Sequence, residues 1–371
     1  MADLIALALP AGAELVEQLR MAWDAGNAVL PVDVRLPDAG QRRLLRTMGA
    51  AAVVEPGGTH TPLDHGRPIE PGDALVVPTS GSTGEPKGVV LTHDAVAASA
   101  RAGSEALEVD PAVDRWLACM PVCHMAGLGV VTKALITGTP LDIHARFDAQ
   151  AVMAAAAAGA TLTTMVPTAL RRVDPAGFRR IVVGGADVPD DLPEVCVISY
   201  GLTETCGGLV YDGTPFAGCE VDVRDGEIFV RGPVLLRAYR DETCPVGDDG
   251  WLPTGDAGRI TPDTRLVVEG RLSDLIISGG ENVWPGPVED VLRTHPAVAE
   301  VAVVGRPDPE WGQRVVAVVE IAAGHEEPSI ESLRDHVRAQ LPAFCAPKEL
   351  EVVSHLPRTT AGKVRRASVQ R

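Results

Sequence analysis

The segment at residues 79–88, Thr-Ser-Gly-Ser-Thr-Gly-Glu-Pro-Lys-Gly, constrains the fold of this chain more than any other feature. Its glycines allow sharp backbone turns, and its hydroxyl and backbone N–H groups can donate hydrogen bonds to an anion. Residues 74–77 before it predict a buried strand, and residues 93–107 after it have the apolar spacing of a helix. The arrangement predicts a phosphate-binding loop, although a plain turn or linker is the alternative for the segment alone. It is not a Walker A loop, because Pro86 and Gly88 flank Lys87.

The composition of the 371 residues predicts a globular protein with one large or two ordinary domains, since 46% are hydrophobic and 22% charged. The formal net charge of −17 argues against a nucleic-acid partner and against anionic membranes. The seven cysteines include no C-x-x-C pair, which favours reduced thiols in a cytoplasm. Cys119, Cys123 and His124 offer metal-ligand atoms, but no fourth ligand follows at zinc-like spacing.

The apolar segments of the chain do not predict a membrane anchor. Residues 4–9 lack the basic region and the cleavage pattern of a signal peptide. Residues 151–160 are rich in alanine and too short to span a bilayer, so they predict a buried or half-buried helix. We therefore expect a cytoplasmic protein without a membrane partner.

Strand-like runs alternate with helical patterns in the first half of the chain, which predicts α/β layering. These runs are residues 51–54, 74–77, 116–120, 141–144, 161–166, 181–183 and 195–199. Residues 221–230 predict a β-hairpin with Asp225-Gly226 as its turn, followed by antiparallel sheet as far as residue 269. We predict an α/β body at residues 1–271 with an antiparallel portion, and a small α+β domain at residues 272–371.

Four further motifs follow the loop in order: YGLTET at residues 200–205, TGD at 254–256, GRLSDLIISGGEN at 270–282 and PRTTAGK at 357–363. With residues 79–88, they resemble the adenylate-forming superfamily of acyl-CoA synthetases, luciferases and carrier-loading adenylation domains. The resemblance runs from about residue 26 to the C-terminus. It implies an acid–thiol ligase that uses ATP, Mg²⁺ and coenzyme A, works through an acyl-adenylate and has a mobile C-terminal lid.

The N-terminal part departs from the superfamily pattern. In most members the phosphate loop lies much further from the N-terminus than residue 79, so we expect the opening part of the body to be missing. Residues 26–33 look like the superfamily's early strand–turn region. The sheet that this region completes and part of a dimer surface are therefore in question, and the oligomeric state stays open between monomer and homodimer.

The resemblance places ATP on several of these segments. The residues expected at the β- and γ-phosphates are Thr79, Ser80, Gly81, Ser82, Thr83 and Lys87. Those expected around the rest of the nucleotide are Gly184, Gly185, Ala186, Tyr200, Gly201, Thr203, Asp256 and Arg271. Among them, Tyr200 would stack on the adenine and Thr203 would contact the α-phosphate, while Asp256 would accept from the ribose hydroxyls. Gly184-Gly185 also fits an ordinary turn at the end of a strand. Glu204 is the expected Mg²⁺ ligand, because a hard cation takes carboxylate and phosphate oxygens.

The resemblance also assigns residues to the two chemical steps. The expected catalytic residues are Lys363, His124, Thr203 and Glu204. Lys363 would bridge the carboxylate and the α-phosphate, although a lysine beside Arg365 and Arg366 is by itself more often a surface residue. His124 ends a P-x-x-H element at the acid pocket and would gate the thiol channel, with a structural role as the alternative. Ser273 is the expected hinge, and Ser278, Gly279 and Gly280 are expected to line the coenzyme A channel.

The acid itself is suggested by residues 121–147, which resemble o-succinylbenzoate–CoA ligases of menaquinone synthesis in the basic Lys133, in Gly138 and in Phe147. Residues 200–213 look like short actinobacterial forms of that enzyme, whereas Val166-Pro167-Thr168 is common to acyl ligases in general. Other readings are a ligase for another aryl or medium-chain acid, a carrier-protein-loading adenylase and a non-catalytic nucleotide-binding regulator. The arginines that could bind a second carboxylate are Arg146, Arg171 and Arg172.

Overall fold

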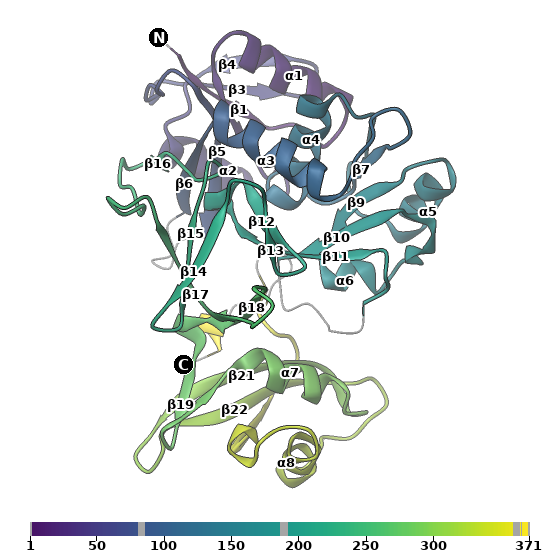
Figure 1. Cartoon of the computed structure of the whole chain (residues 1–371), viewed down its shortest axis with the longest axis vertical. Coiled ribbons are helices and arrows are strands. Elements are labelled where there is room, and N and C mark those ends of the chain that lie inside the picture. Colours follow the sequence, from purple (N-terminus) through teal and green to yellow (C-terminus); the bar gives the residue numbers. More distant parts are fainter. Residues whose placement is uncertain (1, 81–85, 186–191, 359–363, 365, 370–371) are drawn as a thin grey trace. The chain divides into compact units, whose positions relative to one another are not determined.

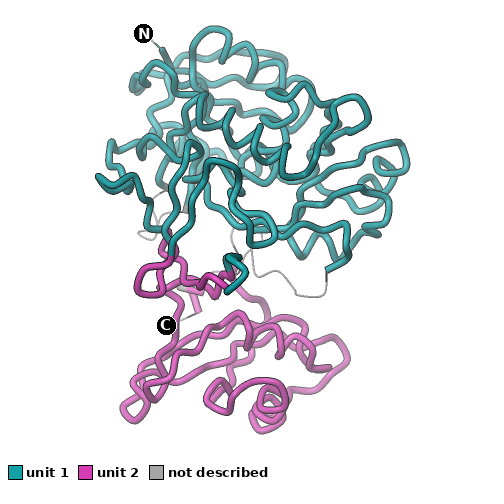
Figure 2. The backbone as a smooth tube through the Cα atoms, viewed as in Figure 1, with its two compact units in different colours: residues 1–222, 229–253, 262–266 teal, residues 223–228, 254–261, 267–371 magenta. Residues whose placement is uncertain are grey.

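The computed structural model describes residues 2–80, 86–185, 192–358, 364 and 366–369 (Figure 1). The chain forms two compact units, shown in different colours in Figure 2. Unit 1 comprises residues 1–222, 229–253 and 262–266, and unit 2 comprises residues 223–228, 254–261 and 267–371. The predicted fold class, an α/β body with an antiparallel portion and a small α+β C-terminal part, is confirmed. The predicted domain boundary at residues 271–272 stays a prediction.

The first sheet of unit 1 has seven strands in the order β16-β6-β5-β2-β1-β3-β4. They are β1 (Leu4–Leu7), β2 (Ala28–Pro31), β3 (Ala52–Glu55), β4 (Thr59–Pro62), β5 (Asp73–Ser80), β6 (Pro86–Thr92) and β16 (Ala238–Tyr239). β1, β2, β3 and β5 run parallel, and every residue of β1 and β2 is buried, as expected for parallel strands covered on both faces. The early strand–turn region predicted at residues 26–33 is thus an inner strand of this sheet. Helices α1 (Ala13–Asp24) and α2 (Asp38–Met48) connect its strands.

The phosphate-loop segment has one strand more than the sequence predicts. The predicted strand is β5 and the predicted helix is α3 (His93–Ala106), but β6 lies between them and pairs antiparallel with β5. Thr79 stands opposite Lys87 in this pairing. No turn residue separates β6 from α3, and the change of direction is made by Thr92, whose Oγ1 accepts from the Ala95 N–H as an N-cap. The apolar residues of β6 therefore merge with the helical pattern in the sequence.

The second sheet of unit 1 has the strand order β13-β12-β11-β10-β9-β7-β8. Its strands are β7 (Trp116–Ala118), β8 (Leu141–Ile143), β9 (Leu162–Met165), β10 (Arg180–Gly184), β11 (Cys196–Leu202), β12 (Gly207–Tyr211) and β13 (Thr214–Pro215). β7 to β11 run parallel, and β12 and β13 add an antiparallel edge. The connecting helices are α4 (Met125–Thr137), α5 (Ala149–Ala157) and α6 (Pro167–Leu170). Gly138 ends α4 with a φ of 71°, which a left-handed helix cap requires.

The remaining strands form two smaller sheets. β14 (Glu220–Arg224), β15 (Glu227–Arg231), β17 (Leu252–Ile260) and β18 (Leu266–Arg271) form a sheet that contains residues of both units. The predicted hairpin is β14–β15, and its turn residues Asp225 and Gly226 have φ of 50° and 84°, as a type I′ turn needs.

The last sheet lies wholly in unit 2 and has the strand order β20-β19-β22-β21, with β23 beside β22. Its elements are β19 (Ile276–Ser278), β20 (Glu281–Val283), α7 (Pro285–Arg293), β21 (Val298–Asp308), β22 (Gly312–Ile321), α8 (Ile330–Arg338) and β23 (Glu349–Val352). The Ser329 hydroxyl caps α8 by accepting a hydrogen bond from the Ser332 N–H. Buried aliphatic side chains of α7, α8 and the strands form one core.

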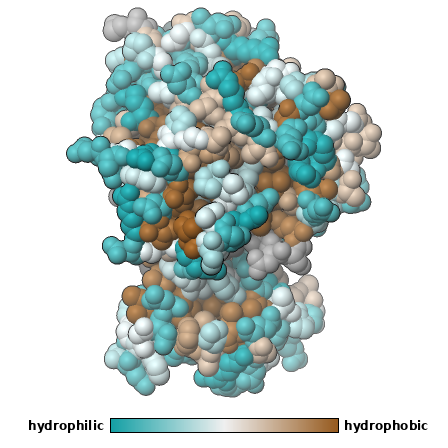
Figure 3. All heavy atoms as spheres, viewed as in Figure 1, coloured by the Kyte–Doolittle hydropathy of each residue, from teal (hydrophilic) through white to brown (hydrophobic). Residues whose placement is uncertain are grey.

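The predicted helix at residues 151–160 is α5, which is more exposed than expected, with Val152 as its buried residue. Among the described residues, no helix combines the length and the apolar character that crossing a bilayer requires. On the face drawn in Figure 3, hydrophobic residues show in separate groups among hydrophilic ones.

Candidate functional site

Several predicted site residues of unit 1 lie where the parallel strands of the second sheet end. His124 follows β7 and is the N-cap residue of α4. Gly184 is the last residue of β10, and Thr203 and Glu204 form a single 3₁₀ turn, η2 (Thr203–Thr205), at the end of β11. Figure 1 shows these strands side by side. The carboxyl edge of a parallel sheet is where open α/β folds bind ligands, so the sheet brings these residues to one such edge.

The glycines at this edge have identifiable structural reasons. A Cβ at Gly184 would lie 2.6 Å from the Ser199 carbonyl oxygen of the neighbouring strand, and a Cβ at Gly201 would lie 1.9 Å from the Gly207 carbonyl oxygen. Gly185 has a φ of 85°. A turn at the end of a strand thus accounts for the pair Gly184-Gly185. Gly185 also has space around it within the described part of the chain, where the nearest atom beyond its chain neighbours is Val166 Cγ1, 3.8 Å from an added Cβ. Tyr200 lies half-buried beside Gly201 at a bulge in β11.

Two predicted site residues from different sheets meet at a side chain that the motifs did not single out. The Lys87 ammonium lies 4.7 Å from the centroid of the Tyr239 ring. The Tyr239 hydroxyl donates a 2.9 Å hydrogen bond to Glu204 Oε1. Burial, followed by the negative charge of Glu204, raises the pKa of Tyr239, so the phenol remains a donor at neutral pH. Lys87 and Glu204 are therefore neighbours of one aromatic residue, Tyr239.

Several predicted site residues lie outside the described part of the chain. They are Gly81, Ser82, Thr83, Ala186 and Lys363, together with the side chain of Ser80. Thr79 is described, and its hydroxyl lies 3.4 Å from the Lys87 carbonyl oxygen across the β5–β6 pair.

In unit 2, Asp256 and Arg271 are brought together. Asp256 is buried on β17, and its Oδ1 lies 2.8 Å from Arg271 Nε. Arg271 Nη1 also donates to the Thr254 carbonyl oxygen, at 3.0 Å. A buried carboxylate with a half-exposed guanidinium beside it can accept hydrogen bonds from a diol while the arginine faces an anion. This chemistry is compatible with the ribose contact expected of Asp256, which stays a prediction.

The predicted hinge and channel residues follow Arg271 in unit 2. Ser273 is exposed, and its hydroxyl lies 3.3 Å from Asp274 Oδ1. Gly279 and Gly280 form the β19–β20 turn with φ of 64° and 84°. The Ser278 side chain is buried, and its Oγ accepts a 3.2 Å hydrogen bond from Lys348 Nζ.

Lys348 and Trp311 lie beside this turn and were not predicted. The Lys348 ammonium stands 4.6 Å from the centroid of the Trp311 ring, and the Trp311 carbonyl oxygen accepts from the Gly279 N–H. The turn therefore carries a cation and an indole that is 39% exposed. A signal in the composition could have found Lys348: only four of the 33 Lys and Arg residues are lysine, at 87, 133, 348 and 363. Because arginine is the usual cation of this chain, its few lysines stand out as candidates for a ligand contact.

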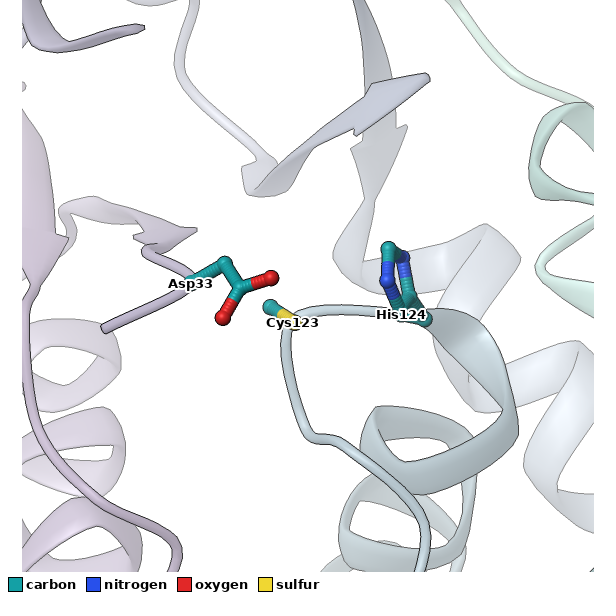
Figure 4. Close-up of side chains that lie close together, drawn as sticks. All are labelled: Asp33, Cys123 and His124. Carbon is teal, nitrogen blue, oxygen red and sulfur yellow. The ribbon is translucent and has the colours of Figure 1, made fainter. Parts of the chain in front are cut away.

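Asp33, Cys123 and His124 form a cluster (Figure 4), in which one donor atom of each lies within 4.8 Å of the others. Arg35 donates hydrogen bonds to both oxygens of Asp33, at 2.8 Å to Oδ1 and 2.9 Å to Oδ2. Its Nη2 also lies 3.9 Å from Cys123 Sγ. Burial raises the pKa of Asp33, but the hydrogen bonds from Arg35 outweigh it and leave the pKa below its ordinary value.

The Asp33 cluster does not fit a metal ion. Burial raises the pKa of the Cys123 thiol to about 11, so the sulfur is protonated at neutral pH. The Arg35 guanidinium, which is bonded to Asp33 and lies 3.9 Å from Cys123 Sγ, carries a positive charge that would repel a divalent cation at these ligands. The cluster instead ties the segment after β2 to the P-x-x-H element at residues 121–124.

Lys133, the one lysine of residues 121–147, is buried on α4. The Lys133 side chain packs beside two glycines. A Cβ at Gly103 would lie 2.8 Å from Lys133 Cε, and a Cβ at Gly129 would lie 3.9 Å from Nζ. Burial lowers the pKa of Lys133 to about 8. No carboxylate pairs with it among the residues that the structure describes. By contrast, the arginines named as partners of a second carboxylate, Arg146, Arg171 and Arg172, are exposed.

Two family models match the chain. One, described as AMP-binding enzyme, matches residues 58–240. The other, described as AMP-binding enzyme C-terminal domain, matches residues 287–363. The first match contains the phosphate loop and η2, and the second ends at Lys363.

Relatives and solved structures agree with these matches. The chain is 37% identical over 332 residues to a probable 2-succinylbenzoate–CoA ligase of Mycobacterium tuberculosis, which covers 82% of this chain and 86% of that protein. It is 35% identical over 378 residues to an indoleacetate–CoA ligase of Aromatoleum aromaticum, which covers 88% and 70%. Its fold is similar to that of o-succinylbenzoate CoA synthetase from Bacillus subtilis in complex with the acyl-adenylate OSB-AMP, with a TM-score of 0.88, 28% identity and coverage of 100% and 88%. The same B. subtilis protein has been solved with ATP and a magnesium ion.

Proposed function

This chain belongs to the family of AMP-binding enzymes, and from that premise we propose that it ligates 2-succinylbenzoate to coenzyme A through an acyl-adenylate. The expectation of an adenylate-forming enzyme is confirmed at the level of the family. The observation that carries the choice of acid is the similarity to the M. tuberculosis ligase over most of both chains. The buried Lys133 supports it, because an acid with two carboxylates needs a second cation.

In the first step, a carboxylate oxygen attacks the α-phosphorus of ATP, the bond to the bridging oxygen breaks, and pyrophosphate leaves. The protein's part is to position the reactants and to stabilise charge. Lys87 and the hydroxyls of the phosphate loop would hold the β- and γ-phosphates, and Thr203 would contact the α-phosphate. Glu204 would hold Mg²⁺, which neutralises the phosphate oxygens when bound. Its carboxylate fits this role, since the hydrogen bond that Tyr239 donates to Oε1 leaves lone pairs on both oxygens.

The other nucleotide contacts would come from Tyr200, Asp256, Arg271 and Lys363. Tyr200 would stack on the adenine, and Asp256 would accept from the ribose hydroxyls with Arg271 beside it. Lys363 would bridge the reacting carboxylate and the α-phosphate. We assign these roles as a proposal that follows from the order of the motifs and from the pairing of Asp256 with Arg271.

In the second step, the thiol of coenzyme A attacks the acyl carbon and AMP leaves. His124 would gate the passage between acid and thiol, while Ser273 would serve as the hinge. Ser278, Gly279 and Gly280 would line the thiol channel. The exposed glycine turn allows close approach of a narrow pantetheine chain. Residues 272–371 would thus act as a lid whose two orientations serve the two steps.

Acid-dependent release of pyrophosphate tests this function. We expect 2-succinylbenzoate with ATP and Mg²⁺ to release pyrophosphate, and coenzyme A to convert the adenylate into a thioester. Indoleacetate, benzoate and medium-chain acids should be at least about tenfold poorer substrates, as expected when a buried cation is left unpaired. Turnover with a monocarboxylic acid as the best substrate would reject the proposed acid. Thioester formation only on a carrier protein would reject a coenzyme A ligase, and no turnover with any acid would favour a nucleotide-binding regulator.

Lys348→Ala is expected to weaken the use of coenzyme A. The ammonium that contacts Ser278 and Trp311 is a cation at the predicted channel, so its loss should raise the KM for coenzyme A about tenfold. Pyrophosphate release in the absence of coenzyme A should stay within about twofold of wild type. Lys348→Arg is the matched control, because it keeps the charge, and it should recover most of the loss. An equal decline in both steps would indicate a structural role for Lys348 instead.

A further inference from the structure

Tyr239 lies between the two charged groups that the proposed function places at the phosphates of ATP. It comes from β16, which pairs with β6 so that Tyr239 stands opposite Val89. Backbone hydrogen bonds fix this register on both sides, from the Arg237 N–H to the Val90 carbonyl oxygen at 2.9 Å and from the Arg240 N–H to the Gly88 carbonyl oxygen at 2.7 Å. The ring is therefore held at the β6 edge on which Lys87 begins its side chain.

The same segment also fixes Glu204, at two points. The Leu236 N–H donates a 2.7 Å hydrogen bond to the Glu204 carbonyl oxygen, and the Tyr239 hydroxyl donates to Glu204 Oε1 at 2.9 Å. Leu236 is buried, so the backbone contact is anchored in the core of unit 1. Backbone and carboxylate of Glu204 are thus both held from residues 236–239, although Glu204 itself belongs to the turn η2.

This geometry has a chemical consequence for a carboxylate that is to bind a cation. A free glutamate samples several rotamers, and fixing one of them costs free energy that weakens metal binding. A hydrogen bond from a neutral phenol fixes one carboxylate oxygen without cancelling its charge, and it leaves lone pairs on both oxygens. A lysine in the same place would pair with the carboxylate and compete with the cation. The Tyr239 ring instead holds the Lys87 ammonium against its face.

We propose that Tyr239 is a positioning residue for Mg²⁺–ATP, which orients the Glu204 carboxylate toward the cation through its hydroxyl and holds the Lys87 ammonium on its ring. The proposal rests on the proposed function, because it takes the phosphates to lie at Glu204 and Lys87. The two parts of the Tyr239 side chain have different roles in this proposal. The hydroxyl orients the carboxylate that binds the metal, and the ring contacts the lysine.

Calorimetric titration of ATP into the full-length protein tests the proposal without turnover. In wild type, binding in MgCl₂ should be tighter than binding in EDTA. Tyr239→Phe removes only the hydroxyl and should reduce this Mg²⁺-dependent gain about tenfold, while binding in EDTA stays within about twofold. Tyr239→Leu also removes the ring and should weaken binding in EDTA as well. Tyr211→Phe removes a buried phenol hydroxyl outside the proposed site and is the matched control.

Tyr239→Phe with a wild-type Mg²⁺ dependence would overturn the proposal. The proposal would also be overturned if Tyr239→Phe lost affinity equally in MgCl₂ and in EDTA while its thermal unfolding matched that of wild type. These results are distinct from a failure of the proposed function, which would show as wild-type protein that binds Mg²⁺–ATP but releases no pyrophosphate with any acid. Tyr239→Phe should also convert supplied acyl-adenylate and coenzyme A into thioester at the wild-type rate, because that step needs no Mg²⁺–ATP.

Discussion

Replacement of Lys363 by alanine is expected to slow formation of the acyl-adenylate by a factor on the order of 10²–10³, which is typical for removal of one charge-stabilising group from a transition state. Thioester formation from supplied acyl-adenylate and coenzyme A should be retained within about threefold. The reason is that the ammonium is needed while negative charge builds up on the α-phosphate and not when the thiol attacks. Single-turnover assays of each step with purified acyl-adenylate measure the two rates separately.

The described residues on either side of Lys363 make this substitution a clean test. Arg358 Nη2 lies 2.9 Å from Glu300 Oε2, and Arg366 Nη2 lies 2.7 Å from Oε2 of the buried Glu289. Arg358 and Val364 also form an isolated antiparallel bridge. Removal of the Lys363 side chain leaves these attachments in place, so the variant should unfold at the wild-type temperature.

Two results would contradict this assignment of Lys363. One is a Lys363→Ala protein with wild-type adenylation. The other is an equal loss in both steps by a folded protein, which would argue against a lid that serves the two steps in different orientations. Lys363→Arg is the informative second variant. A planar guanidinium cannot place a compact charge between two anions, so we expect it to recover less than about a tenth of the lost rate.

The elements that sequence reasoning predicted are those with strong local signals. β3, β5 and β7 to β11 lie at predicted strand-like runs, β2 lies in the predicted strand–turn region, and the β14–β15 hairpin has the Asp-Gly turn that its backbone requires. β6 was missed because its apolar residues lead into α3 without a turn residue. The Thr92 cap marks the start of the helix, but no glycine or proline turn separates the strand from the helix at this junction.

Candidate site residues could be named from the sequence only where a motif is continuous. Thr203 and Glu204, Gly184 and Gly185, and Asp256 and Arg271 all lie in such motifs, and the structure adds how each is held, including the pairing of Asp256 with Arg271. Tyr239 could not be found in this way, because its importance arises from pairing of β16 with β6 and from contact with a turn 35 residues earlier in the chain. Long-range strand pairing has no counterpart in local periodicity.

The distribution of lysine is a signal that does not depend on order along the chain. Lys87 contacts Tyr239, Lys133 is buried in the acid-pocket segment, Lys348 contacts Ser278, and Lys363 ends the last motif. Structural cations on this protein are arginines instead, such as Arg237 at Asp73 and Arg179 at Asp114. A fork of donors suits a fixed carboxylate, whereas a single ammonium suits a ligand that must enter and leave.

Substitution of Lys133 by methionine is expected to remove the preference for a dicarboxylic acid. Its ammonium reaches Gly129 on α4, one turn from Met125, and Met125 lies against Gly207 just after η2. A cation buried there can pair with the carboxylate that does not react. Loss of one partner of a buried charge pair typically costs 2–5 kcal/mol, so kcat/KM for 2-succinylbenzoate should fall about 100-fold or more.

Matched substrates separate this effect from general damage. 4-Oxo-4-phenylbutanoate lacks the ring carboxylate of 2-succinylbenzoate, and 2-butyrylbenzoate lacks the side-chain carboxylate. One of these two monocarboxylates should still react with wild type. Its kcat/KM with Lys133→Met should be within about threefold of the wild-type value, or higher, because a monocarboxylate leaves the buried lysine of the wild-type protein without a partner. An equal loss of kcat/KM for the dicarboxylate and for this monocarboxylate would exclude Lys133 as the second cation.

The same substitution should stabilise the protein in the absence of substrate. Burial lowers the pKa of Lys133 from 10.5 to about 8, so the unfolded chain binds more protons between these two values and the free energy of unfolding rises with pH across that window. Below pH 8 the charged, buried lysine costs on the order of 3 kcal/mol, which methionine avoids at similar volume. Urea unfolding at pH 7 should show Lys133→Met to be more stable than wild type. Between pH 7 and pH 10, the free energy of unfolding of Lys133→Met should lack the increase expected for wild type. A residue that lowers stability and raises selectivity is retained for its ligand, whereas a less stable Lys133→Met would mean that the ammonium is already paired inside the protein.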